Sequence, residues 1–454
     1  MSRRAVRTSF VMLAGLLAAL LTCASLAKPA GAQVSPGEPG PPAPSAPAAE
    51  SSSSSTTTTS STATADPVPD GVRMSGFLQV DAVTYQQSSI DELDPGSRQP
   101  LNEDRFVIRR ARLRADARHG LVSGSVVLDA NTINGPQVRL FSAEASVGYP
   151  KSVRPHVQAT LGLFLIPFGF ETTEQANRRL FLEPSNWVRA LFPGRRDLGA
   201  RIAGEWSFLR YALAVMNGNP SESASLPERD PNRAKDFVGR VGAGGELFQK
   251  VALEIGVSGL WGKGFHPGAA PTKDTVVFRD ANEDGLVQPT ELQRMPGNPG
   301  DASQNFERFG LGGDAALSFE WPVLGRGRLY GELVWANNLD RALYPADPVA
   351  LGRNLRELGV MLGVRQEITR HLELGARYDS YDPDRDANDR QGARLVVKDA
   401  SYGTLAVALA WCTLPFARVT LEYDHQKNPL GRSQSGKPTT LAMDSLTLRG
   451  QVEF

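Results

Sequence analysis

Apolar and polar residues alternate with a period of two along most of the chain. At 251–258, every second residue is Val, Leu or Ile. Similar alternation recurs at 141–149, at 419–424 and at 446–454. The pattern is typical of β-strands with one apolar face, because successive side chains of a strand point to opposite sides. The chain is therefore predicted to be all-β.

The alternating segments are long compared with the strands of soluble proteins, which average about 5–6 residues. Many approach the ~9–11 residues that a tilted strand needs to cross a bilayer. The predicted strands, about sixteen in number, are 75–85, 104–118, 120–130, 138–149, 156–166, 198–207, 209–217, 236–247, 250–261, 307–319, 327–338, 354–366, 370–381, 394–412, 416–426 and 442–454.

The connections between these segments alternate in length. Very short turns, such as 119–120 and 207–208, lie between long polar connections. The long connections are 86–103, 167–197, 218–235, 262–306, 339–353, 382–393 and 427–441. This arrangement is typical of a transmembrane antiparallel up-and-down β-barrel with short periplasmic turns and long extracellular loops. We expect residues 71–454 to form this barrel.

The predicted number of strands also suggests a function. A barrel of about 16–18 strands leaves an aqueous channel, whereas an eight-stranded barrel fills itself with side chains. The expected function is therefore passive diffusion of small hydrophilic solutes. Two other interpretations stay open, a plugged barrel with a structural or adhesive role and a soluble secreted β-sandwich.

The N-terminal part has the composition of targeting and spacer segments. Three arginines precede an apolar run at 10–21, and an A-x-A site follows, which predicts a signal peptide over 1–32. A lipoprotein interpretation centred on Cys23 is weaker, because Thr precedes the cysteine. Residues 33–70 are rich in Pro, Ser and Thr and are predicted to be a disordered spacer. The protein is expected to be exported.

The charge of the chain excludes a nucleic-acid partner. The sequence holds 49 basic and 49 acidic residues, and residues 1–32 contain four of the basic ones and none of the acidic ones. The processed chain would therefore carry a formal charge of −4, with no global basic field to attract nucleic acid. Without Cys23, Cys412 would be alone, so no intrachain disulfide is expected.

The last predicted strand closes on an aromatic residue, Phe454. An alternating strand of this kind resembles the C-terminal assembly signal of outer-membrane proteins. The resemblance implies recognition by the outer-membrane assembly machinery, a location in the bacterial outer membrane and contact with its lipid.

Basic residues concentrate on one predicted strand. Arg110, Arg112 and Arg114 share a face and are expected to form a ladder that points into the lumen. A bulge at Arg109-Arg110 is predicted, because strict alternation would otherwise place Arg109 in lipid. Arginine favours anions, since its planar fork matches phosphate and carboxylate oxygens. The alternative is ordinary lumen lining, neutralised by acids on neighbouring strands.

The segment 166–199 is predicted to be the third long loop and to fold into the lumen as a constriction. Its basic residues, also candidates for an anion path, are Arg178, Arg179, Arg189, Arg195 and Arg196. Its acidic residues are Glu171, Glu174, Glu183 and Asp197. A solvated loop that caps the barrel is the alternative.

The stretch DANEDGLVQPTE (280–291) matches the calcium-loop pattern D-x-[DN]-x-[DN]-G-x5-E. Side-chain oxygens would come from Asp280, Asn282 and Asp284. Leu286 would add its backbone carbonyl, Gln288 could hold a water, and Glu291 could bind in bidentate fashion. Structural Ca²⁺ is therefore possible, with a merely acidic loop as the alternative; no cofactor is required for diffusion.

Catalytic motifs are not found. The sequence has five histidines, and neither G-x-S-x-G nor H-E-x-x-H occurs. Asp424 and His425 are adjacent on a predicted strand, so they would point to opposite faces. An enzymatic function is not expected.

Five stretches together resemble a known family. They are RFVIRRARLRADARHG (105–120), LFLIPFGFE (163–171), KDFVGRVG (235–242), RYDSYDPDRD (377–386) and QVEF (451–454). They are similar to the phosphate-selective porins O and P, over most of 71–454. The resemblance implies a 16-stranded outer-membrane barrel, usually a homotrimer, that passes phosphate or polyphosphate. A general non-selective porin is the alternative.

Overall fold

The computed structural model describes residues 70–86, 104–133, 135–222, 230–283, 285–391, 394–427 and 444–454. All of them belong to one compact unit of the chain. The predicted signal peptide and nearly all of the predicted spacer lie outside the described residues.

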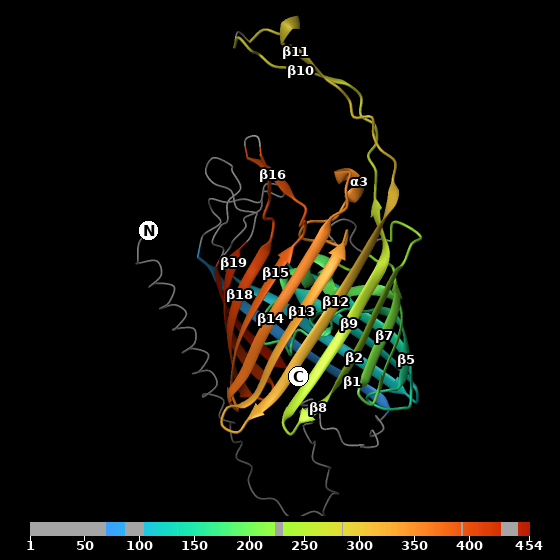
Figure 1. The fold of residues 1–454 in the computed structure, drawn as a ribbon, viewed down its shortest axis with the longest axis vertical. Coiled ribbons are helices and arrows are strands. Elements are labelled where there is room, and N and C mark those ends of the chain that lie inside the picture. Colours follow the sequence, from blue (N-terminus) through green and yellow to red (C-terminus); the bar gives the residue numbers. More distant parts are fainter. Residues whose placement is uncertain are drawn as a thin grey trace, which may run out of the picture. The chain divides into compact units, whose positions relative to one another are not determined.

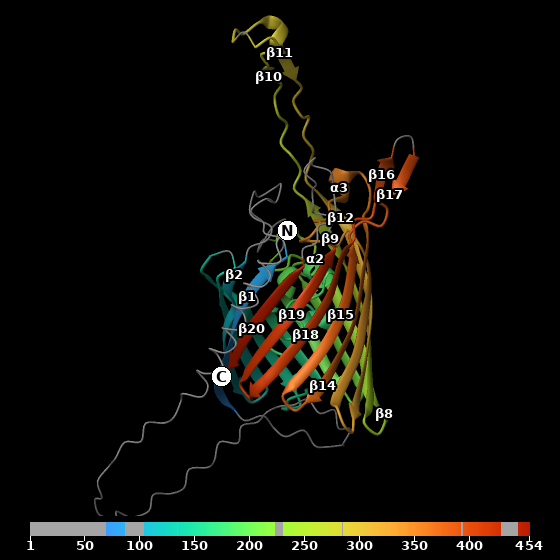
Figure 2. The same ribbon diagram turned by 90° about the vertical axis from the view of Figure 1, so that its left-hand side faces the viewer.

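Sixteen antiparallel strands close into one barrel, in which each strand pairs with the next and the last pairs with the first (Figures 1 and 2). The barrel strands are β1 (Gly71–Tyr85), β2 (Arg105–His119), β3 (Val122–Asn131), β4 (Gln137–Tyr149), β5 (Val157–Leu165), β6 (Arg196–Trp206), β7 (Leu209–Met216), β8 (Asp236–Phe248), β9 (Val251–His266), β12 (Gln304–Trp321), β13 (Gly325–Asn337), β14 (Arg356–Thr369), β15 (Leu372–Asp382), β18 (Tyr402–Leu414), β19 (Ala417–Lys427) and β20 (Ser445–Glu453). The predicted barrel is confirmed, and the β-sandwich interpretation is wrong, because one closed sheet replaces two packed ones.

The outer surface of the barrel is apolar and bordered by aromatic residues. Exposed aromatic side chains near the short turns are Tyr149, Trp206, Phe208, Phe248, Trp321, Phe416 and Phe454. Those near the long loops are Phe106, Phe237, Trp261, Trp335, Tyr378 and Tyr423. Two aromatic girdles around an apolar band are the arrangement of a barrel that spans a membrane.

The C-terminal Phe454 completes the seam between β20 and β1. Its backbone exchanges hydrogen bonds with that of Gly76, at 2.9 and 3.0 Å. A Cβ atom at Gly76 would lie 2.5 Å from the ring of Phe454 and 2.5 Å from the carbonyl oxygen of Arg112. The aromatic end therefore needs a glycine on the first strand, and the two residues close the barrel together.

The predicted bulge on β2 is confirmed. Gln79 pairs with Arg110 and Val80 with Ile108, so Arg109 is the extra residue. Phe106 then faces outwards, with 71% of its surface exposed. The bulge thus keeps apolar side chains in lipid and directs the side chains of Arg109 and Arg110 into the barrel.

Two predicted boundaries are wrong. The segment 394–412 is divided: β17 (Arg394–Val397) pairs with β16 (Asn388–Gln391) in a separate hairpin, and β18 starts only at Tyr402. Strand β9 continues to His266, past the predicted end at 261. Polar residues occupy the parts of strands beyond the apolar band, so the alternation that reveals a strand fades there. A second hairpin consists of β10 (Thr275–Phe278) and β11 (Leu292–Met295).

The described helices are all short. They are η2 (Glu171–Thr173), α2 (Asn186–Leu191), η3 (Pro193–Arg195), η4 (Pro289–Glu291) and α3 (Pro348–Leu351). In the part of the chain that the structure describes, no helix has the length and apolar character needed to cross a membrane.

Candidate anion path at the inner loop

Residues 166–195, here called the inner loop, join β5 to β6 and pack inside the barrel. Phe168, Trp187 and Phe192 are completely buried, with ring centroids 4.9–6.4 Å apart. A Cβ atom at Gly359 of β14 would lie 2.5 Å from the Cβ of Trp187, so the glycine leaves the room that the Trp187 side chain needs against the wall. The loop is therefore docked by apolar burial and is not the solvated cap of the alternative interpretation.

Carboxylates on the wall hold the backbone of the inner loop. Glu332 accepts hydrogen bonds from the N–H groups of Phe170 and Glu171. Glu422 accepts one from the N–H of Leu182 at 2.9 Å. Asp379 of β15 does the same for Asn186, at 2.8 Å. These acids satisfy backbone donors that would otherwise be buried without partners.

Glu183 is the charged centre of the inner loop. Its carboxylate lies 2.9 Å from Arg109, 2.9 Å from Arg110 and 3.2 Å from Arg449. Arg449 also pairs with Asp81 at 2.6 Å. Burial alone would raise the pKa of Glu183, a loop residue outside the spanning strands, but the three arginines outweigh it and hold this pKa well below its usual range.

Five of the predicted arginines form one cluster, at the place where β2, β6 and the inner loop meet. They are Arg110, Arg112, Arg179, Arg195 and Arg196. Burial, and then the positive charges of the other four, lower the pKa of Arg195 in the inner loop well below its usual range. The sequence alone did not reveal that these five would meet.

Phe141 separates two members of the cluster. The guanidinium carbon of Arg112 lies 3.4 Å from the ring centroid on one side, and that of Arg196 lies 3.6 Å away. Such cation–π contacts stabilise positive charge. Arg112 also pairs with Asp129 at 2.9 Å. Because the ring of Phe141 lies between the two guanidinium groups, the positive charges of Arg112 and Arg196 can approach each other.

Three members of the cluster lack an acidic partner. Among the described residues, no carboxylate lies within ion-pair distance of Arg179, Arg195 or Arg196. Arg195 donates to three backbone carbonyls, those of Glu171, Thr172 and Glu174. For Arg179 and Arg196, which are 4% and 9% exposed, the Nε and Nη1 atoms have no hydrogen-bond partner within the described chain. Unpaired buried donors of this kind call for an acceptor.

The other predicted arginines lie elsewhere. Arg114 pairs with Asp116 of its own strand at 2.6 Å and is largely exposed. Arg178 and Arg189 are exposed residues of the inner loop. The structure therefore divides the predicted set into five clustered arginines and three dispersed ones.

Sequence reasoning missed Phe141 as a site residue. Strict alternation at 141–149 places it on the outer face, but the register shifts after Val127, which pairs with Ser142, while Leu128 pairs with Leu140. This second bulge turns Phe141 inwards, where it is buried. The one available signal was the run RLFSAE, in which Leu140 and Phe141 compete for the lipid face.

The predicted calcium ligands lie in the hairpin of β10 and β11, except for Asp284, which is outside the described residues. Glu291 accepts hydrogen bonds from the N–H groups of Ala281 and Gln288, both at 3.2 Å, and Asp280 accepts one from Gly285 at 2.8 Å. The two ends of the motif thus meet. Among the described residues, no group of three or more acidic, His or Cys side chains could hold a metal ion. Calcium binding stays a prediction.

Titration calorimetry of the full protein checks this prediction. We expect a dissociation constant for Ca²⁺ of about 10⁻⁴–10⁻³ M, as in extracellular calcium modules, and about tenfold weaker binding in Glu291→Gln, which loses a bidentate ligand. Asp386→Asn, a matched change in another acidic loop, should leave binding unchanged. No heat of binding at millimolar calcium would contradict the assignment.

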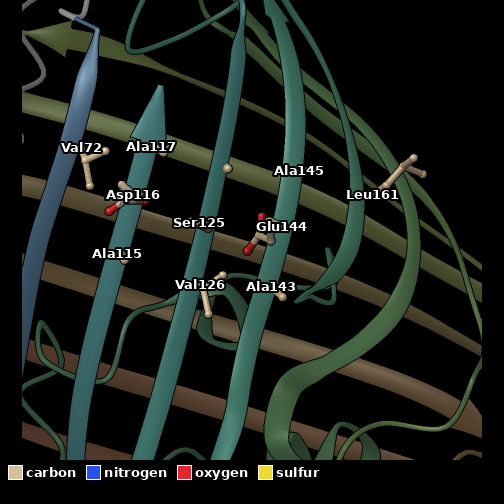
Figure 3. A pocket seen from close by; sticks show the side chains of 11 residues that line it. Val72, Ala115, Asp116, Ala117, Ser125, Val126, Ala143, Glu144, Ala145 and Leu161 are labelled. Carbon is tan, nitrogen blue, oxygen red and sulfur yellow. The ribbon is translucent and has the colours of Figure 1, made fainter. Parts of the chain in front are cut away.

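A hollow of about 470 Å³ lies on the outer wall, over β1 to β5 (Figure 3). Its lining is mostly apolar and includes Val72, Leu161 and several alanines, together with Asp116, Ser125 and Glu144. Val72 and Leu161 are strongly exposed. Small side chains on adjacent strands produce the hollow. It belongs to the lipid-facing surface and does not contribute to a path through the barrel.

Comparisons with known proteins place the fold. No protein-family model matches the chain, and no curated protein does. Among solved structures, the channel DcaP of Acinetobacter baumannii aligns with a TM-score of 0.52 at 11% identity, over 84% of this chain and 97% of that one. OprB of Pseudomonas putida aligns with a TM-score of 0.53 at 10% identity, over 85% and 94%.

The chain shares its barrel fold with these solved structures. A trimer form of OmpT, an outer-membrane protein of Vibrio cholerae, also aligns, with a TM-score of 0.50 at 10% identity over 85% of this chain and 99% of that one. At these identities, the likeness concerns the barrel fold alone. The identity of any solute depends on the side chains of this chain.

Proposed function

We propose that the protein is an outer-membrane porin that lets small hydrophilic solutes diffuse and prefers anions, phosphate and polyphosphate among them. One observation carries the preference: Arg179 and Arg195 of the inner loop meet Arg196 of β6 without a carboxylate partner among the described residues. The porin fold supports the channel.

The physical argument rests on unsatisfied donors. A buried guanidinium group without an acceptor is costly, and an anion that enters the cluster supplies one. Rings of Arg or Lys in a pore favour anions for this reason. Arg110 and Arg112 contribute less, because Glu183 and Asp129 already neutralise them. We therefore expect a moderate preference rather than an exclusive one.

Planar-bilayer recording in a KCl gradient tests the proposal. The wild type should show stepwise openings with a reversal potential on the chloride side, and added phosphate should reduce the chloride current. In the double variant Arg179→Gln, Arg196→Gln, we expect the chloride-to-potassium permeability ratio to fall about two- to fivefold, equivalent to roughly 0.5–1 kcal/mol of lost attraction.

A control separates the position of the charges from their number. Arg294→Gln removes a positive charge from the hairpin of β10 and β11, where Arg294 pairs with Asp274. It should leave the permeability ratio unchanged. Equal ratios in wild type and double variant would overturn the role of the cluster and leave a general porin.

A second candidate function is a plugged structural barrel. The complete burial of Trp187 and Phe192 favours it, because a firmly docked loop can also obstruct a lumen. Folded, heat-modifiable protein that never opens in the bilayer would support this candidate over the channel.

The proposal extends to the assembly of the protein. We infer a homotrimer in outer-membrane lipid, inserted by the assembly machinery through the strand that ends at Phe454. The exposed apolar band between the girdles supports the lipid contact. Chemical cross-linking in native membranes would test the number of copies.

A further inference from the structure

His266 lies where three segments of the chain meet. It is the last residue of β9, and its side chain is only 8% exposed. Its Nδ1 atom is 2.6 Å from a carboxylate oxygen of Asp347, and its Nε2 atom is 2.9 Å from one of Asp301. Asp301 lies near the end of the 267–303 extension between β9 and β12, and Asp347 precedes α3. A single imidazole therefore joins the extension to the connection between β13 and β14.

This contact lies outside the membrane-spanning part of β9. Trp261 belongs to the aromatic girdle near the long loops. Further along the strand, Lys263 pairs with Glu307 at 3.4 Å, and both are largely exposed. An exposed ion pair does not belong in hydrocarbon, so His266, beyond it, is subject to the pH of the surrounding water.

Both ring nitrogens of His266 face carboxylate oxygens. Neutral imidazole has one N–H donor, whereas imidazolium has two, so only the protonated ring satisfies both contacts. Accordingly, the hydrogen bonds to Asp347 and then to Asp301 raise the pKa of His266 above its ordinary value. The hydrogen bond from His266 likewise lowers the pKa of Asp301. The contact is thus complete below the ordinary pKa of histidine and is lost as pH rises through the raised one.

Other charged groups near His266 have their own partners. Lys263 pairs with Glu307, and Arg353 with Asp384. Arg308 and Arg341 are buried and both pair with Asp236. Asp340 accepts a hydrogen bond from Tyr381 at 2.8 Å. The two aspartates therefore dominate the surroundings of the imidazole.

The segment held by Asp347 reaches the inner loop. The N–H of Ala346 donates to the carbonyl of Asp340 at 2.8 Å and closes a turn. Within that turn, the N–H of Arg341 donates to the carbonyl of Ala190 in α2 at 2.9 Å. The side chain of Arg341 donates to the carbonyl of Leu191 at 3.4 Å. A continuous line of contacts thus runs from His266 to the helix of the inner loop.

We propose that His266 is a proton-dependent latch, which in its charged form ties the 267–303 extension to the 339–355 loop and steadies the contact of that loop with α2. When the ring loses its proton, one nitrogen becomes an acceptor that faces a carboxylate. Repulsion then releases one of the two tethers. Acid conditions hold the rim of the barrel together, and alkaline conditions loosen it.

Hydrogen exchange of the full-length protein in detergent tests the latch, with wild type and His266→Asn compared at the same pH so that intrinsic exchange rates cancel. At about pH 6, amides of the 339–355 loop should exchange about tenfold faster in the variant, equivalent to the loss of about 1.4 kcal/mol of protection. At about pH 9, the two proteins should exchange alike.

Controls keep the result interpretable. His371→Asn changes an exposed histidine at a turn, where the ring contacts the carbonyl of Cys412. It should leave the 339–355 loop unaffected at both pH values. Asp347→Asn removes the charge of one tether with the imidazole intact and should reproduce the acid effect if His266→Asn impairs folding. A ratio of one at both pH values, or an equal increase at both, would overturn the proposal.

Discussion

Glu183→Gln is expected to increase the anion preference of the channel and to weaken the docking of the inner loop. The carboxylate lies within 2.9–3.2 Å of Arg109, Arg110 and Arg449, and the variant leaves these positive charges less compensated. Removing one partner of a fully buried pair costs about 3–5 kcal/mol. Because the Glu183 side chain is 29% exposed, we expect about 2 kcal/mol here.

Two measurements check this result. Bilayer reversal potentials should shift further to the chloride side, and the heat-modifiability midpoint should fall. Glu320→Gln is the matched control, since Glu320 is exposed at a turn and lies 4.0 Å from Lys250. It should change neither quantity. A reversal potential that moves towards potassium would show that the arginine cluster does not face the ion path.

Trp187→Ala should release the inner loop from the wall. Its indole is completely buried against Gly359 and packs edge-on against Phe168 and Phe192. Truncating a buried Trp to Ala costs about 3–5 kcal/mol in a core. The barrel strands do not depend on this contact, since their hydrogen bonds form a closed ring. The lost packing free energy should therefore weaken the docking of the inner loop and not the barrel itself.

Single-channel conductance is the measurement for this variant. We expect larger and noisier openings than in the wild type, with the barrel itself still heat-modifiable. Trp321→Ala, a truncation on the exposed outer girdle, is the control and should leave conductance unchanged. Openings identical to those of the wild type would mean that other contacts hold the loop without Trp187.

The two variants also separate the candidate functions. If the inner loop only narrows an open lumen, Glu183→Gln alters selectivity in a protein that already conducts. If the loop plugs the lumen, the wild type is silent and Trp187→Ala is the variant that begins to conduct.

Comparison of two bulges shows how far the sequence could be interpreted. The bulge at Arg109 was predictable, because the charge of Arg109 would otherwise lie in lipid beside Ala111. The bulge that turns Phe141 inwards was not, because an apolar residue is acceptable on the lipid face. Only its contacts with Arg112 and Arg196 explain the inward position.

The partners of the arginines were beyond sequence reasoning. Arg110 pairs with Glu183, 73 residues away, and Arg449 with Asp81, 368 residues away. The first pairing depends on the course of the inner loop inside the barrel, and the second on the closure of β20 against β1. Neither pairing produces a periodic pattern in the sequence.

The sequence by itself determined the strands, their two faces, the alternation of turns and loops, and the side of β2 on which arginines lie. These properties are local, because side-chain direction in a strand repeats every two residues. The tertiary structure decided which arginines are neutralised, which remain without an acidic partner, and where the inner loop is seated. Those outcomes depend on contacts between distant segments, and only the closed barrel brings such segments together.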